Sequence, residues 1–224
     1  NFLLRDAILV DLDPPNIERG DLRVRNGLIV ERGPDLVPGD EEVVDVEGDV
    51  ILPGMVNAHM HLYSALAVGM PVPDVSNFQQ ALDEVWWPLD RSLDSEDVRC
   101  SAQIGLLGAL KAGCTTVIDH HASPNAIRGS LDIIAEEAGD IGLRTVLSYE
   151  LTDRNGRGGL KVGLAENADA IGRYSGGFCR AITGLHAGFT LSDAALSQVA
   201  KLPGPIHIHV GEGEQDVAYA IAQG

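Results

Sequence analysis

The chain of 224 residues has little cysteine, few aromatic residues and little positive charge. Its three cysteines are an odd number and none stands in a CxxC pair, which argues against a disulfide framework and against a cysteine zinc site. We therefore expect a reducing, cytoplasmic setting. No apolar run approaches the roughly 18 uncharged residues that a membrane span needs, so we expect no membrane helix.

The charge balance excludes further classes of partner. Sixteen Lys and Arg residues stand against thirty-three Asp and Glu residues, which gives a formal net charge of −17. Such a surface repels phosphate backbones and anionic lipid headgroups over a Debye length, so nucleic acid and membrane surfaces are poor partners. Hydrophobic content of 45% and charged content of 22% are ordinary for a globular protein. We expect a small-molecule substrate and, for the full-length protein, a homo-oligomer.

The first part of the chain, residues 1–53, is predicted to be a small β unit. The pair Asn26-Gly27 between two apolar runs is the strongest short hairpin signal, and the unit ends at the Pro53-Gly54 pair. Strands are predicted at residues 3–10, 22–24, 28–30, 43–46 and 50–52.

In the second part, residues 54–224, strands alternate with helices. The strands are predicted at 55–58, 115–119, 144–149, 181–185 and 206–210, and helices at 95–112, 130–141, 162–174 and 193–201. Five βα units in series imply parallel strands with right-handed crossovers, either in a doubly wound sheet or in a (β/α)8 barrel.

All seven histidines lie in or just beyond these strands. Barrel enzymes gather their catalytic groups at the carboxyl ends of the strands, and no GxGxxG or Walker sequence opens a helix here, so the sequence favours the barrel. Residues 51–224 fall short of the roughly 250 residues of a typical barrel. Because the chain also opens on Asn1 instead of Met, we expect a fragment. Five strands of a barrel leave the first and the fifth with unpaired edges, so we do not expect this fragment to be an active, stable monomer by itself.

Two strand ends carry the pattern of a metal centre. His59 and His61 are two residues apart in an extended segment, so both side chains point to the same side and can converge on one ion. His209 adds a third imidazole at the end of the fifth strand. Glu212, three residues further on, is placed to face a metal-activated water and shuttle its proton.

Several segments together resemble a known family. PGMVNAHMH at 53–61, GLHA at 184–187 and HVGE at 209–212 resemble motifs of the amidohydrolase superfamily, in its deaminase and chlorohydrolase branch. TTVIDHHASP at 115–124 and YELTDRNG at 149–156 are most similar to the SsnA group of aminohydrolases, associated with selenium metabolism.

The resemblance implies a distorted (β/α)8 barrel beside a small N-terminal β-sandwich. It implies one divalent metal, Zn or alternatively Fe, held by His59, His61 and His209, with Glu212 as proton shuttle and His186 as a substrate contact. The sixth-strand histidine and eighth-strand aspartate of that branch have no counterpart in this chain. No predicted strand carries the lysine that bridges two metals in binuclear members, which implies a mononuclear site.

The remaining polar residues near the strand ends have less specific assignments. We place His121 and Glu150 with the substrate contacts, although at most one of the adjacent His120 and His121 can face the barrel centre. For three other features we favour structural roles: Asp119 accepting from N–H groups, His207 hydrogen-bonded to a neighbour, and Trp86-Trp87 packed against the barrel. The alternative for Trp86-Trp87 is a place in the wall of a substrate pocket.

These observations predict a metal-dependent hydrolase that cleaves C–N bonds other than peptide bonds, foremost by deaminating a nitrogen heterocycle. Hydrolysis of a cyclic amide or of a chloro substituent by the same activated water is the alternative within enzymes. From a different class, the chain is a non-catalytic half barrel, either as a fragment or as a subunit.

Overall fold

The computed structural model describes residues 1–223, which form two compact units, one of Asn1–Gly54 and one beginning at Met55. No helix of the described residues is long and apolar enough to cross a membrane.

The first unit is a five-stranded sheet. Its strands are β1 (Phe2–Leu12), β2 (Pro15–Arg25), β3 (Leu28–Gly33), β4 (Glu42–Asp45) and β5 (Val50–Ile51). They lie in the order β3-β2-β1-β4, and β5 also pairs with β1. The predicted hairpin is confirmed: β2 and β3 are antiparallel, and Asn26 and Gly27 between them have φ of 51° and 75°, as a primed turn requires.

The core of the first unit is small. Leu3, Ala7, Leu9 and Leu22 are its buried apolar side chains, so the unit has little hydrophobic stabilisation of its own. Residues 1–54 contain one sheet, and the second layer that a sandwich needs stays a prediction.

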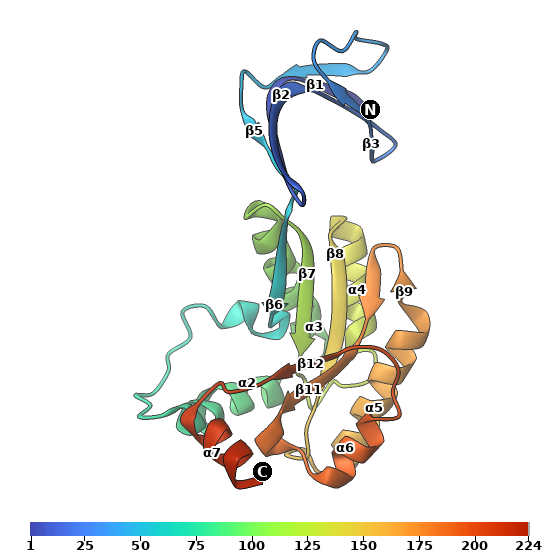
Figure 1. Cartoon of the computed structure of the whole chain (residues 1–224). Helices are drawn as coiled ribbons and strands as arrows, with labels where there is room; N and C mark the ends of the chain where they lie inside the picture. The colour runs from blue at the N-terminus through green and yellow to red at the C-terminus, as the bar shows by residue number, and fades with distance from the viewer. Residues whose placement is uncertain (224) are drawn as a thin grey trace. The chain divides into compact units, whose positions relative to one another are not determined.

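The second unit is built on parallel strands that lie side by side (Figure 1). The main strands are β6 (Met55–Met60), β7 (Cys114–His121), β8 (Arg144–Leu151), β11 (Thr183–Ala187) and β12 (Ile206–His209). Their pairing, β6-β7-β8-β11-β12, follows chain order and is parallel throughout. The alternation of strands and helices predicted from the sequence is confirmed.

Helices connect these strands and cover them. They are η1 (Leu62–Ala67), α1 (Phe78–Ala81), the π-helical η2 (Leu82–Trp86), α2 (Trp87–Ser92), α3 (Ser95–Lys111), α4 (Ser130–Ile141), α5 (Gly156–Arg173), η3 (Gly188–Thr190), α6 (Asp193–Val199) and α7 (Glu214–Gln223). Local signals set their ends: the Asp94 side chain accepts from two backbone N–H groups at the start of α3, and Gly142 ends α4 with φ of 78°. Helix α3 packs on β7, and α4 and α5 pack on β8, around Leu106, Leu131 and Leu147.

The fourth strand differs from the prediction for residues 181–185. A short hairpin precedes it, β9 (Ser175–Gly176) and β10 (Cys179–Ala181). Strand β10 pairs with the first half of β8 and β11 with its second half, so the strand is interrupted at Ile182. The sequence predicts one strand here because the break falls within a single short run of residues and no glycine or proline marks it at Ile182.

Gly184 in β11 allows this strand to approach β8 closely. A Cβ at this position would lie 2.5 Å from the Tyr149 carbonyl oxygen, which is backbone and cannot move aside cheaply. We expect Gly184→Ala in the full-length protein to lower the free energy of unfolding by about 1–3 kcal/mol. Urea unfolding measures this change.

A matched control is available in helix α4. A Cβ at Gly139 would meet nothing within 4 Å, so Gly139→Ala is expected to raise stability by about 0.5–1 kcal/mol. Equal stability of Gly184→Ala and the parent protein would show that β11 is free to move away from β8.

Candidate metal centre

Three imidazoles converge at the carboxyl ends of the first and last parallel strands. His59 belongs to β6, His61 follows it directly, and His209 is the last residue of β12. The Nε2 atom of His209 lies 3.2 Å from Nε2 of His59 and 3.2 Å from Nε2 of His61. Two nitrogens bound at 2.0–2.1 Å to a tetrahedral ion lie about 3.3–3.4 Å apart, so the spacing suits Zn²⁺ or a similar ion.

The hydrogen bonds behind two of these rings fix their proton positions. Nδ1 of His61 lies 2.7 Å from the His120 carbonyl oxygen, and Nδ1 of His209 lies 3.0 Å from the His186 carbonyl oxygen. A carbonyl only accepts, so each Nδ1 donates its hydrogen and each Nε2 presents a lone pair. Two lone pairs facing each other across 3.2 Å repel unless a cation lies between them, so this donor set fits a divalent metal.

The protonation state of the three rings agrees with a metal-ligand role. Burial lowers the pKa of His61 and of His209 to about 4, and burial also lowers the pKa of His59. All three imidazoles are therefore neutral at pH 7. A neutral imidazole is the form that binds a metal.

Glu212 lies in the turn that follows β12, and Asp216 holds this turn. The Asp216 carboxylate accepts from the backbone N–H of Gly211 at 2.6 Å and of Glu212 at 3.3 Å. Burial, and then the charge of Asp216, raise the pKa of the Glu212 carboxyl, which makes it a better proton acceptor than an ordinary carboxylate.

A cavity of about 190 Å³ adjoins the three-histidine cluster. His61, His209 and Glu212 face it from the metal side, and His186 and Glu150 are also in its wall. The rest of the wall is Tyr63, Ser64, Phe78, Leu82, Trp86, Trp87, Asp90 and Arg154. Polar and ionisable side chains thus make up most of the wall, and the aromatic and apolar ones beside them are Tyr63, Phe78, Leu82, Trp86 and Trp87.

Trp86 and Trp87 therefore line the cavity, where the sequence favoured packing against the barrel. The two residues belong to η2 and α2, in the long connection between β6 and α3. Their position depends on how this connection folds over the strand ends, and no local pattern in the sequence encodes that.

A buried charged group forms one wall of the cavity. Arg154 donates to Glu150 at 3.2 Å and also to Asp90, and its guanidinium lies 5.1 Å from the centre of the Trp87 ring. Burial raises the pKa of Glu150 to about 7, against the opposing effect of Arg154. The sequence predicted a site role for Glu150 but none for Asp90 or Arg154. Arg154 belongs to the segment YELTDRNG, but its partner Asp90 is 64 residues away and no sequence pattern links the two.

His186 is positioned at the same end of β11. Its Nδ1 atom pairs with the Thr190 hydroxyl at 2.8 Å, and its ring centre is 5.7 Å from that of His209 and 6.1 Å from that of Trp87. The ring therefore lies between the histidine cluster and the aromatic wall, where a bound substrate would contact it.

The neighbours His120 and His121 point to opposite sides of β7, as adjacent strand residues must. The His120 ring stacks on His209 with centres 4.6 Å apart, on the side of the metal centre. His121 is fully buried on the other side, where its Nε2 pairs with the Ser123 hydroxyl at 2.8 Å, and it is not part of the cavity wall. The structure does not bring His121 together with the other predicted substrate contacts.

Asp119 has the structural role predicted for it. Its carboxylate is fully buried and accepts from the backbone N–H of Leu62 at 2.8 Å, which ties η1 to β7 just beyond His61. Burial raises the pKa of Asp119 to about 7.

Parallel βα units with polar side chains gathered at the carboxyl ends of their strands are the arrangement of a barrel-type enzyme fold. Residues 50–224 match the Amidohydrolase family, and the chain belongs to this family. The resemblance predicted from the strand-end motifs is confirmed.

Curated relatives cover nearly the whole chain. It is 29% identical over 225 residues to the 5'-deoxyadenosine deaminase of Methanobrevibacter smithii, covering 96% of this chain and 49% of the relative. It is 25% identical over 223 residues to the 5-methylthioadenosine/S-adenosylhomocysteine deaminase of Pyrococcus furiosus, covering 96% and 51%. The chain thus spans about half the length of the curated relatives it matches.

Solved structures agree on the fold. The atrazine chlorohydrolase TrzN of Arthrobacter aurescens TC1, complexed with zinc, superposes with a TM-score of 0.82 at 21% identity, covering 100% of this chain and 55% of that one. E. coli guanine deaminase superposes with a TM-score of 0.79 at 19% identity, covering 100% and 56%. The predicted amidohydrolase-type barrel is therefore confirmed as the fold, of which this chain holds a part.

Proposed function

We propose that the full-length protein is a metal-dependent hydrolase that removes ammonia from a nitrogen heterocycle. The observation that carries the proposal is the convergence of three Nε2 atoms from His59, His61 and His209 beside a cavity that Glu212 also lines. The histidine cluster and Glu212 are both needed, since hydrolysis requires an activated water and a group that moves its proton.

The chemistry divides between the metal and the side chains of this chain. A bound divalent ion, Zn²⁺ or alternatively Fe²⁺ and one per site, would lower the pKa of water towards about 7. Glu212 accepts the proton of the attacking water and delivers it to the leaving amine, for which its raised pKa is suited. His186 and Glu150 contact the heterocycle from the cavity wall.

The side chains of the cavity wall support a planar substrate that carries hydrogen-bonding groups. Trp86, Trp87 and Phe78 offer aromatic faces, and Glu150 with a pKa of about 7 can either donate or accept a hydrogen bond near neutral pH. Several relatives are named as deaminases of adenosine derivatives, which supports a purine-like heterocycle as the first substrate to test.

The setting of the enzyme belongs to the same proposal. Its few cysteines, none of them in a CxxC pair, support a reducing cytoplasmic setting, and its acidic composition argues against a nucleic-acid partner. We place it there as a homo-oligomer that acts on a small molecule.

Metal dependence is the most direct test. We expect the full-length protein to contain about one Zn or Fe per subunit by elemental analysis, and to release ammonia from adenosine derivatives or another amino-substituted heterocycle. Dialysis against a chelator should abolish turnover, and one equivalent of Zn²⁺ or Fe²⁺ should restore it.

Two results would contradict the proposal. Turnover that persists in the metal-free protein would exclude the metal centre. Release of chloride or opening of a cyclic amide, without deamination of any heterocycle in the screen, would instead favour the alternative hydrolases.

A further inference from the structure

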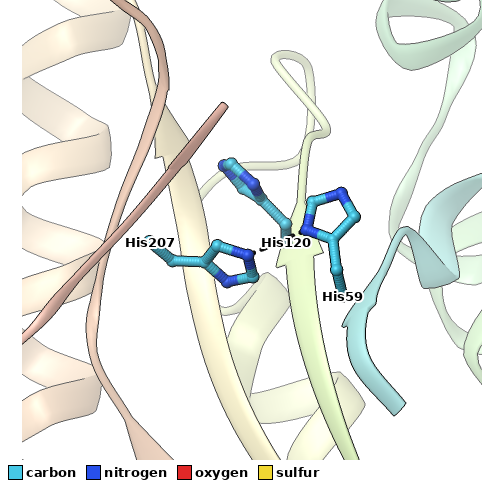
Figure 2. A group of neighbouring side chains, drawn as sticks. All are labelled: His59, His120 and His207. Atoms are coloured by element: carbon cyan, nitrogen blue, oxygen red, sulfur yellow. Dashed lines mark hydrogen bonds between the residues drawn. The ribbon is translucent and has the colours of Figure 1, made fainter. Parts of the chain in front are cut away.

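A fourth histidine lies directly behind the metal centre. Nδ1 of His59 is 2.8 Å from Nε2 of His207, which precedes His209 by two residues on the same face of β12. Figure 2 shows the His207 ring directed at the His59 ring, with His120 beside both. The ring centres of His59 and His207 are 4.9 Å apart and their planes meet at 70°.

The distance between Nδ1 of His59 and Nε2 of His207 distinguishes a hydrogen bond from a shared metal ion. Two nitrogens on one tetrahedral zinc lie about 3.3–3.4 Å apart, as the Nε2 atoms of the proposed centre nearly do. At 2.8 Å, the contact between His59 and His207 has the length of an N–H···N hydrogen bond instead. His207 is therefore a partner of a ligand and not a ligand of a second ion.

The same pattern holds for all three ligands of the proposed centre. His61 and His209 each present Nδ1 to a backbone carbonyl oxygen, at 2.7 Å and 3.0 Å. His59 presents Nδ1 to His207, so the acceptor behind this ligand is a side chain and can be removed by substitution.

The direction of the hydrogen bond follows from the metal-binding role. For His59 to bind an ion through Nε2 as a neutral ring, its hydrogen must lie on Nδ1. Nε2 of His207 must then accept that hydrogen, and His207 carries its own hydrogen on Nδ1, an atom with no partner among the described residues. The opposite direction would place a hydrogen on His59 Nε2, facing the ion.

We propose that His207 is the positioning residue of the metal ligand His59, holding its Nδ1 tautomer and the direction of its ring. The inference rests on the proposed metal centre. It assigns His207 a function in metal affinity in addition to packing.

His120 provides a comparison within the same cluster. Its ring is fully buried, 4.8 Å from the His207 ring and 5.9 Å from the His59 ring, and neither of its ring nitrogens has a hydrogen-bond partner among residues 1–223. His120→Phe keeps a stacked aromatic ring and the backbone carbonyl that orients His61, so it is a matched control for a histidine lost from this cluster.

The test compares Zn²⁺ affinity, by competition with a chromophoric chelator, in the full-length protein and three variants. His207→Leu removes the acceptor, and we expect Zn²⁺ to bind about 10- to 100-fold more weakly. His207→Gln keeps an acceptor, its Oε1, near the position of Nε2, and is expected to retain most of the affinity. His120→Phe is expected to bind Zn²⁺ as the parent protein does.

Two further measurements test the role without relying on one variant. The Co²⁺-substituted His207→Gln protein should show the visible d–d bands of the parent protein, since the ligand set is unchanged. In the zinc-loaded parent protein, long-range ¹H–¹⁵N NMR of the imidazoles should find the His207 hydrogen on Nδ1.

The outcomes separate this inference from the proposed function. Four results would each overturn the inference and leave the proposed function standing. Two concern the variants: a folded His207→Leu that binds Zn²⁺ as the parent does, or a His207→Gln with altered Co²⁺ bands. The other two are a His207 hydrogen found on Nε2, and a second bound ion that is lost with His207. A parent protein that binds no divalent metal would overturn the metal centre itself.

Discussion

Glu212→Gln in the full-length protein is expected to keep its metal and to lose turnover by about 10²- to 10⁴-fold, the range typical of a general acid–base group. The amide preserves the size of the side chain but cannot accept a proton. The Asp216 carboxylate that holds the turn bonds the backbone at Gly211 and Glu212, so the turn should survive the change. Steady-state kinetics together with elemental analysis of the same sample measure both quantities.

The acidic run after β12 offers a matched control. Glu214 is exposed at the start of α7 and does not line the cavity, so Glu214→Gln should leave turnover unchanged. If Glu212→Gln lost its metal in proportion to its activity, Glu212 would be a ligand or a support of the centre and not a proton shuttle.

His209→Ala is expected to have the largest effect on metal binding. His209 Nε2 contacts Nε2 of both His59 and His61, so its removal leaves two of the three described donors and opens the middle of the cluster. The loss of Zn²⁺ affinity should exceed the 10- to 100-fold typical of residues that only orient a ligand, and activity should fall with it. Chelator competition and ammonia release measure the two effects.

His121→Asn is the comparison for this variant, since His121 also lies on a strand of the same sheet but is buried and pairs with Ser123 on the far side of β7. It should keep its metal. A raised KM with retained metal would support His121 as a substrate contact, whereas His209→Ala that keeps full metal content would contradict the ligand set.

The sequence predicted those parts of the fold and site that local patterns encode. Short apolar runs that alternate with helical patterns predicted the parallel strands. The pair Asn26-Gly27 predicted the hairpin, because both residues adopt the positive φ that its turn requires. His59, His61 and His209 could be placed together because the carboxyl ends of parallel strands meet at one edge whatever the loops do.

The parts that could not be predicted depend on contacts between distant segments. Asp90 reaches Arg154 only because the connection between β6 and α3 folds over the strand ends. The interruption at Ile182 depends on β9 and β10 pairing beside β8, and a short apolar run does not reveal a break of this kind. The metal centre could therefore be predicted in more detail than the substrate wall.

The carbonyl groups behind His61 and His209 have an evolutionary consequence. They belong to the backbone of residues 120 and 186, so they persist whatever side chain occupies those positions. The His186 side chain faces the cavity while its carbonyl orients a metal ligand. If the proposed function holds, we expect substitutions at residue 186 to alter substrate preference while the metal stays bound, so that new substrates can be acquired without loss of the histidine cluster.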